Sequence, residues 1–215
     1  MKYQDIFQAL KGVGDIDLSA LALPVAETDF ALYPINCNPD CVDEIVVSML
    51  TEARNRNRDS FLTYFEATPE RTFHWITSSV AKDNTRILFA LREVGTRELY
   101  GYMGLAYGDA GGGRIEGDAI VRFSDISRPG LMRAAFLSLV EWVMIDIGIK
   151  EVWVRVRSSN PAVKFYNQCG FSVEFEAPLY EINGSLGELV ELSETPLQNY
   201  AVTSDDSLFY MKYHR

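Results

Sequence analysis

Apolar residues recur at helical spacing in three segments of the chain. We expect the first helix to start at Asn38-Pro39, the second at Thr68-Pro69 and the third after Pro129-Gly130. A polar cap followed by proline is typical of a helix N-terminus. The stripes expected to face the core are Val42, Ile45, Val46 and Met49, then Phe73, Ile76, Thr77 and Val80, then Met132, Phe136, Leu139, Val140, Val143 and Ile147.

Strand-like apolar runs occupy much of the remaining chain. Residues 86–92, 99–106 and 119–123 predict three consecutive strands, and glycines at 111–113 suit a hairpin between the second and third. Valines at 152, 154 and 156 alternate with polar or aromatic residues in a further strand, and Asn160-Pro161 opens a short helix. Residues 171–175 and 208–213 predict two more strands, and an initial strand and a loop are expected within 16–37.

This order of elements predicts an α/β fold with a mixed, mostly antiparallel central sheet and flanking helices. We expect one domain over residues 1–215, with its core at about 86–175. Residues 1–85 would supply an N-terminal strand and two helices, and 176–215 would supply C-terminal strands.

Composition and charge argue against two functional classes, nucleic-acid-binding proteins and membrane proteins. The chain is 47% hydrophobic and 23% charged, as expected of a globular protein, and its formal net charge is -10. That charge argues against nucleic-acid binding, although a local basic pocket can still hold an anion. No apolar run reaches the length of a membrane span or a signal peptide, so we expect a cytoplasmic protein without membrane contact.

The three cysteines predict no metal site. Cys37 and Cys41 lie four residues apart, but no second Cys or His pair follows at a suitable spacing. Cys169 precedes a Gly-Phe pair and suits a small buried position. We expect all three thiols to be reduced.

The segment Val154–Phe171, VRVRSSNPAVKFYNQCGF, places Tyr166 on a helix just beyond the carboxyl end of a strand. Open α/β sheets build their ligand sites at that position. A phenol keeps its proton at neutral pH and can donate it to a leaving group. The alternative is a core aromatic with a structurally bonded hydroxyl.

Two further segments carry candidate chemistry. The loop RFSDISRPGLMR, 122–133, leads into a helix N-terminus that favours a phosphate, and Arg122, Arg128 and Arg133 add positive charge; an ordinary capped helix start is the alternative. In RIEGDAIVRF, 114–123, the residues Glu116, Asp118, Ile120 and Arg122 share one face if the strand is regular. A carboxylate there could accept a proton from an ammonium group, or both could be solvated hairpin residues.

The cluster Arg54–Asp59, followed by Phe61, Tyr64 and Trp75, combines cations with aromatic rings. Such a cluster could grip an anionic acceptor. The alternative is a solvated helix end with Arg/Asp pairs.

These motifs resemble those of the GNAT superfamily of N-acetyltransferases, with the best agreement over residues 86–175. RIEGDAIVRF, PGLMRAAF and SSNPAVKFYNQCGF together are similar to a branch that acetylates nucleotide-linked amino sugars. Two departures stand out. The spacing from Asn160 to Tyr166 is one residue shorter than usual, and the pyrophosphate loop reads Ser127-x-x-Gly130-x-Met132, without its final glycine or alanine.

The resemblance implies acetyl-CoA as co-substrate, no metal, and direct attack of an amine on the thioester. The helices before residue 85 would then lie on the acceptor side. Glu116 or Asp118 would take the proton from the amine, and Tyr166 would protonate the departing thiolate. The donor would be held by Ile120, Val121, Arg122, Arg128, Gly130, Leu131, Met132, Arg133 and Asn160, with its pantetheine between the strands at 119–123 and 152–157.

Three readings of the function stay open at this point. The first is transfer to the primary amine of a small molecule, including an amino sugar nucleotide. The second is transfer to a protein or peptide amine, which the acidic charge would suit. The third is a non-catalytic sensor of acyl-CoA. A homodimer is compatible with each.

Overall fold

The computed structural model describes residues 2–12, 21–123, 128–183, 190–195 and 201–215. The chain divides into two compact units. The first comprises Met1–Ala53 and Thr68–Val152, and the second comprises Arg54–Ala67 and Trp153–Arg215. The expectation of one domain over 1–215 stays a prediction.

The sheet of the first unit is antiparallel throughout, in the order β1-β2-β4-β5-β6. All five residues of β2 and all eight of β5 are buried, because side chains on both faces are covered. The strands are β1 (Leu23–Pro24), β2 (Phe30–Pro34), β4 (Ile87–Glu93), β5 (Leu99–Ala106) and β6 (Arg114–Arg122).

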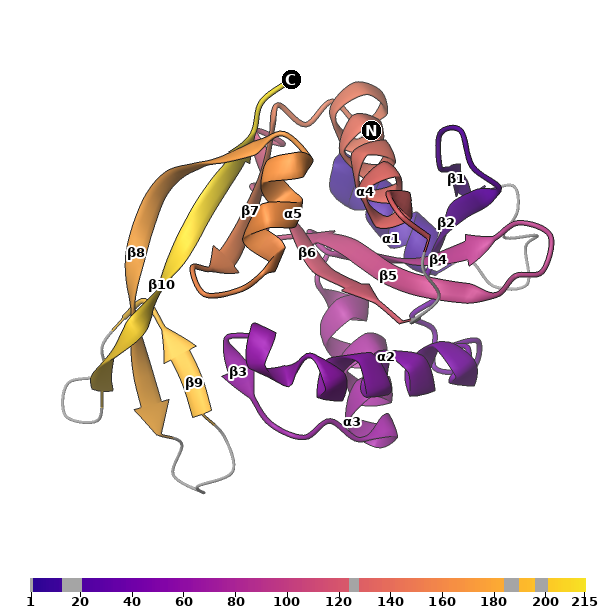
Figure 1. Ribbon diagram of the computed structural model, residues 1–215. Helices are drawn as coiled ribbons and strands as arrows, with labels where there is room; N and C mark the ends of the chain where they lie inside the picture. The colour runs from indigo at the N-terminus through magenta and orange to yellow at the C-terminus, as the bar shows by residue number, and fades with distance from the viewer. Residues whose placement is uncertain (1, 13–20, 124–127, 184–189, 196–200) are drawn as a thin grey trace. The chain divides into compact units, whose positions relative to one another are not determined.

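Helices cover both faces of this sheet. Figure 1 shows α1 (Tyr3–Lys11) and α4 (Leu131–Glu141) on one face, and α2 (Glu44–Arg56) and α3 (Pro69–His74) on the other. The π-helical segments η3 (Trp75–Val80) and η4 (Trp142–Asp146) extend α3 and α4. Trp142 joins the layers, because its ring lies 6.2 Å from Phe7 of α1 and 5.7 Å from Phe89 of β4.

The second unit is a twisted antiparallel ribbon with one helix. Its strand order is β7-β10-β8-β9-β3. The helix α5 (Ala162–Gln168) connects β7 to β8 and packs on β8. The remaining elements are η2 (Arg58–Ser60), β3 (Thr63–Tyr64), β7 (Glu151–Arg157), β8 (Phe171–Asn183), β9 (Val190–Ser193) and β10 (Ala201–Tyr213).

The predicted α/β class with a mostly antiparallel sheet and flanking helices is confirmed. Several elements also match closely. Residues 99–106 form β5, and the Thr68 hydroxyl caps α3 by accepting a hydrogen bond from the Arg71 amide at 3.3 Å. Val152, Val154 and Val156 are the buried side of β7.

The first predicted helix starts later than expected. It begins at Glu44, because Asp43 rather than Asn38 caps it, with Oδ1 accepting from the Ile45 amide at 2.9 Å. The buried stripe is Val46, Val47, Leu50 and Ala53, and Ile45 is 64% exposed. The expected contribution of Ile45 to the core is therefore wrong.

Other expectations were incomplete. The helix α1 was not predicted, and β8 and β10 are longer than expected. Phe73 is exposed, since Thr72, Ile76 and Val80 form the inner stripe of α3 and η3. The part of the expected strand at 16–37 that falls within 16–20 lies outside the described residues.

Candidate active site

The strand β6 contains a β-bulge at the point where the resemblance places the donor. Tyr102 pairs with Val121, but the next same-face pair is Gly104 with Asp118, so β6 holds one extra residue. Ala119 has a φ of 52°, which only a few non-glycine residues adopt. A bulge withdraws backbone groups from the ladder. The peptide groups around Ile120 are therefore the candidates on this strand for pairing with the amides of a ligand.

The bulge changes which side chains share a face of β6. Glu116 and Asp118 lie on one face, opposite Ala106 and Gly104. Beyond the bulge that face is taken by Val121, and Arg122 lies on the other face. The expectation that Ile120 and Arg122 continue the face of the two carboxylates is therefore wrong, because it assumed a regular strand.

The two carboxylates differ in access. Glu116 has only 9% of its side chain exposed, and Oε1 accepts a hydrogen bond from Arg114 at 2.8 Å. Asp118 has 29% exposed, and Oδ2 lies 3.7 Å from the Arg86 guanidinium. Asp118 is the one that a dissolved amine reaches more easily.

The helix α4 follows a glycine. Gly130 has a φ of 82°, and a β-carbon at that residue would meet none of the described residues within 4 Å. The Gly130 carbonyl accepts from the Ala134 amide at 2.9 Å, which starts the helical ladder, and the Leu131 amide donates to the Arg128 carbonyl at 3.1 Å. The first amides of a helix have no intrahelical acceptor and favour a negative charge. The predicted phosphate site at this helix start stays a prediction.

The size of Met132 is accommodated by the sheet. A β-carbon at Gly101 of β5 would lie 3.2 Å from Sδ of Met132, so the Met132 side chain occupies the space above that glycine. The residue that replaces a glycine or alanine in the family loop therefore leans onto β5. Arg133 is exposed and Leu131 is buried.

Arg128 is held by residues of the sheet. Its guanidinium lies 3.8 Å from a Glu93 carboxylate oxygen and 5.8 and 5.9 Å from the ring centroids of Phe30 and Tyr100. Its side chain is 51% exposed, so solvent weakens this ion pair. Residues 124–127 of the same loop, including Ser127, lie outside the described residues.

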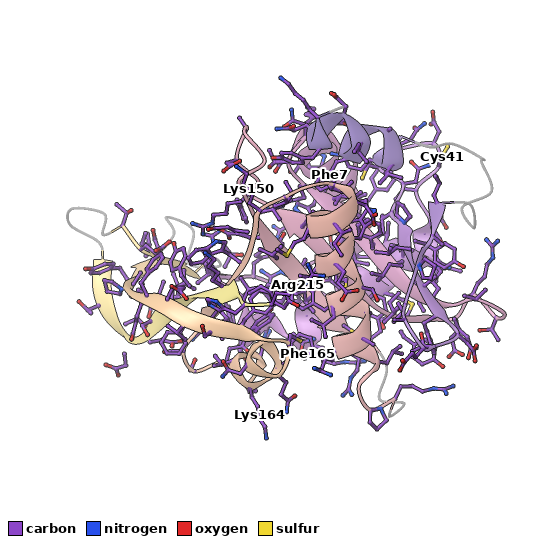
Figure 2. All side chains as sticks on the ribbon, turned by 90° about the horizontal axis from the view of Figure 1, so that it is seen from above. Phe7, Cys41, Lys150, Lys164, Phe165 and Arg215 are labelled. Atoms are coloured by element: carbon purple, nitrogen blue, oxygen red, sulfur yellow. The ribbon has the colours of Figure 1, made fainter. Side chains whose placement is uncertain are left out.

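Tyr166 belongs to the second unit, on α5. It is 8% exposed, and its ring lies 5.4 Å from Phe165 and 6.1 Å from Phe171. Gly170, with a φ of 91°, ends the turn that follows the helix. On the same helix, Lys164 is exposed and extends away from the ribbon, next to Phe165 in Figure 2. Tyr166 is thus on the inner side of α5.

Asn160 lies two residues before α5 and bonds to its first residue. Its Oδ1 accepts a hydrogen bond from the Ala162 amide at 2.8 Å, and its Nδ2 donates to the Ser60 carbonyl at 3.4 Å. Both functions of the side-chain amide are used inside the protein. The predicted contact of Asn160 with a donor molecule stays a prediction.

Sequence reasoning did not identify Asp206 on β10. Its carboxylate accepts from Ser158 Oγ at 2.5 Å, from Ser159 Oγ at 2.7 Å and from Arg157 Nε at 2.6 Å. These donors form the turn between β7 and α5. Because Asp206 lies 47 to 49 residues from them, no local pattern links the two segments.

The basic cluster after α2 has a structural role. The Arg54 guanidinium lies over Phe61 at 3.9 Å and Phe65 at 4.7 Å, and it donates to the Thr63 carbonyl at 2.6 Å. Arg58 lies 5.1 Å from the exposed ring of Tyr64. Arg54 is therefore part of the packing of this segment, which is neither the anion-binding role nor the solvated Arg/Asp pairing that the sequence suggested.

The cysteines are free. Cys37 and Cys169 are buried, and Cys41 is exposed, as its place in Figure 2 shows. Burial raises the pKa of the Cys37 thiol to about 11, against a lowering contribution from Lys11. Across the described ranges, no three His, Cys, Asp or Glu side chains lie close enough together to hold a metal ion. None of the described helices has the length and hydrophobicity needed to span a bilayer.

The geometry thus separates the predicted residues into two sets. Tyr166 and Asn160 lie in the second unit. The first unit holds the remaining candidates: Glu116, Asp118, Ile120, Val121, Arg122, Arg128, Gly130, Leu131, Met132 and Arg133.

Comparison with known proteins identifies the fold and the family. Solved structures with the same fold include the ribosomal L7/L12 α-N-protein acetyltransferase RimL, with 12% identity, 89% of this chain and 92% of that chain covered and a TM-score of 0.62. A mutant of the spermidine N-acetyltransferase SpeG from Vibrio cholerae has 13% identity, coverage of 86% and 92%, and a TM-score of 0.59.

A third structure is a GCN5-related N-acetyltransferase from Brucella melitensis, with 16% identity, coverage of 88% and 77%, and a TM-score of 0.59. No curated protein sequence matches the chain at a significant level. The family model of the GNAT acetyltransferase domain, however, matches residues 23–172, which is more than half of the chain. The chain is therefore an acetyltransferase that belongs to the GNAT family.

Proposed function

We propose that the protein transfers an acetyl group from acetyl-CoA to a primary amine of a small molecule, by direct attack of the amine on the thioester. One observation carries the proposal: a single strand, β6, combines a bulge at Ala119 with the carboxylates of Glu116 and Asp118. Such a strand can pair with an amide-containing donor and can also remove a proton from the acceptor.

The donor would be held mainly by backbone groups. Ile120 to Arg122 would pair with the pantetheine amides, and the amides from Gly130 to Arg133 would hold the pyrophosphate. Two features support this fit: no described residue lies within 4 Å of a β-carbon at Gly130, and Met132 leans onto Gly101. Arg128, whose pair with Glu93 is half exposed, would supply positive charge. No metal is needed for this reaction.

The chemical step needs one base and one acid. Asp118 is the better candidate for the base, because it is more exposed than Glu116 and its cation is more distant. It would take a proton from the ammonium, and the neutral amine would attack the thioester carbonyl. The carbon–sulfur bond then breaks, the Tyr166 hydroxyl would give its proton to the leaving thiolate, and the second proton lost by the amine nitrogen would restore the phenol. Positioning of the two substrates would supply much of the rate.

We propose the kind of acceptor from the net charge of the protein. The chain has a net charge of -10, which favours a cationic amine such as a polyamine. SpeG and RimL, which share the fold, act on spermidine and on a ribosomal protein. Because Arg54 is engaged by Phe61, Phe65 and Thr63, it supports the anionic amino sugar nucleotide less than the sequence suggested. A basic peptide is the second candidate, since the same charge would attract it.

The test is release of CoA thiol from acetyl-CoA by the purified protein. Spermidine, a lysine-rich peptide and a nucleotide-linked amino sugar would be offered separately. Turnover with spermidine above the other two would support the proposal, and preference for the peptide would favour the second candidate. Tight CoA binding without turnover of any amine would instead indicate a sensor.

The roles of the residues are tested by three variants. Asp118→Asn should lower kcat by about 10²-fold or more at neutral pH, in the range of general base catalysis. Glu116→Gln should have the smaller effect. Tyr166→Phe should reduce kcat while CoA affinity stays within about twofold. A larger loss of kcat in Glu116→Gln than in Asp118→Asn would instead identify Glu116 as the base.

A further inference from the structure

The carboxylate of Asp206 organises the turn that precedes α5. Its Oδ1 accepts from Ser158 Oγ at 2.5 Å and from the Ser159 amide at 3.0 Å. Its Oδ2 accepts from Ser159 Oγ at 2.7 Å and from Arg157 Nε at 2.6 Å. Every residue from the end of β7 to Ser159 is thus bonded to one side chain.

The strand β10 is shaped to present this carboxylate. Its ladder with β8 is interrupted between Thr203 and Ser207, which leaves Asp206 in the irregular part. Ser207 then joins the turn directly, because its carbonyl accepts from the Ser158 amide at 2.8 Å and its amide donates to Ser158 Oγ at 3.2 Å. The interruption allows Asp206 to face the turn.

The same network extends to the segment before β3. Arg157 uses its second nitrogen, NH1, to donate to the Asp59 carbonyl at 2.5 Å. Asn160 donates to the neighbouring Ser60 carbonyl at 3.4 Å. The β7–α5 turn therefore holds η2 as well as α5.

The electrostatics of Asp206 match this role. Only 9% of its side chain is exposed, and that burial by itself raises the pKa of the carboxyl. Hydrogen bonds from Ser158, Ser159 and Arg157 outweigh the burial, so the pKa lies well below its usual range. The carboxylate is ionised at neutral pH, which makes the bonds that it accepts strong.

We propose that Asp206 is a positioning residue for acetyl transfer. It fixes the Ser158–Ser159 turn, the turn fixes the Asn160 cap, and the cap sets the position of α5 and of the Tyr166 hydroxyl. The inference rests on the proposed role of Tyr166 as the acid. Asp206 itself contacts no reacting atom, so it acts on kcat through Tyr166.

The test is a double-mutant cycle between Asp206 and Tyr166. Asp206→Asn should lower kcat by about 10–100-fold in the wild-type background, because a displacement of about 1 Å can cost that much. In the Tyr166→Phe background the same change should lower kcat by less than about 3-fold, since the group it positions is gone. The matched control is Asp205→Asn, an exposed neighbour, which should leave kcat unchanged.

Three further measurements complete the test. Asp206→Glu, which keeps the charge, should recover part of the lost kcat. Arg157→Lys, whose side chain cannot donate to Asp206 and to the Asp59 carbonyl in the same geometry, should lower kcat in the wild-type background and much less in the Tyr166→Phe background. If Asp206→Asn does not fold, Ser159→Ala removes one donor from the same carboxylate, and it should show the same dependence on Tyr166 at a smaller size.

The outcomes separate the two proposals. Equal losses of kcat from Asp206→Asn in both backgrounds would overturn the positioning role and leave Tyr166 as the acid. Full turnover in Tyr166→Phe alone would reject Tyr166 as the acid, and this inference with it.

Discussion

Met132, at the N-terminus of α4, lies directly above Gly101 of β5, with Sδ 3.2 Å from the position of a β-carbon on that glycine. The Met132 side chain fills the space that a side chain on residue 101 would need. The helix start can carry a large side chain because the strand carries none. The glycine missing from the phosphate loop therefore has a structural counterpart on the neighbouring strand.

Gly101→Ala should damage both stability and donor binding. The added carbon would lie 2.6 Å from the Val121 carbonyl oxygen, so β5 and β6 must separate. We expect a loss of about 1–3 kcal/mol in the free energy of unfolding, measured by urea denaturation, together with weaker CoA binding by calorimetry. Gly95→Ala is the control, since nothing lies within 4 Å of its added carbon. Unchanged CoA binding in a folded Gly101→Ala would separate β5 from the donor site.

Ala119 should accept glycine and reject valine. Its φ of 52° is left-handed, and a β-branched side chain is strained there. Ala119→Val should lower the stability by about 1–3 kcal/mol, whereas Ala119→Gly should be within about 1 kcal/mol of wild type. Thermal unfolding measures both. Equal melting temperatures for glycine and valine would argue against the bulge.

Asp206→Asn should destabilise the protein at neutral pH and much less in acid. Replacement weakens several hydrogen bonds to a charged group, at about 1.5–3 kcal/mol. Because the pKa of Asp206 is lowered in the folded protein, its stabilisation is complete above the unfolded carboxyl value of about 4 and decreases as the pH falls below that. Urea denaturation of both proteins across pH 2–7 measures the difference. A constant difference over that range would contradict the assigned ionisation.

Only one thiol should react in the folded protein. Cys41 is exposed, whereas Cys37 and Cys169 are buried, and a thiol must ionise to react. A thiol reagent at pH 8 should label one cysteine per chain, and three after unfolding. Cys41→Ser should abolish the fast labelling. Fast labelling of Cys37 would be inconsistent with its pKa of about 11.

Local patterns predicted the elements whose signals are complete within a few residues. Examples are the Thr68-Pro69 helix start, the apolar run of β5 and the inner stripe of α4. Helix caps and the spacing of apolar residues depend only on residues a few positions apart. The helix α1 was missed because its inner side ends in Lys11, a residue that normally indicates a solvent-facing side. Here Lys11 Nζ donates to the carbonyls of Val80 and Asp83, each at 2.8 Å, beyond the end of η3.

The sequence predicted the individual residues of the candidate site, but not the hydrogen bonds that link distant segments around it. Tyr166, Gly130 and the β6 carboxylates were predicted because each belongs to a short motif, and their roles stay predictions. Asp206 was not found, since its partners lie in another part of the chain and its own sequence, Ser204-Asp-Asp-Ser207, is ordinary for an acidic tail. Hydrogen bonds between segments that are far apart in the sequence have no local sequence pattern.

The bulge at Ala119 also interrupts the alternation of faces along β6. In a regular strand Asp118 and Val121, three residues apart, would lie on opposite faces of the sheet. The extra residue places both on the same face, opposite Gly104 and Tyr102. The face to which Asp118 belongs therefore follows from the register of β6 with β5, and counting residues back from the start of α4 gives the wrong face.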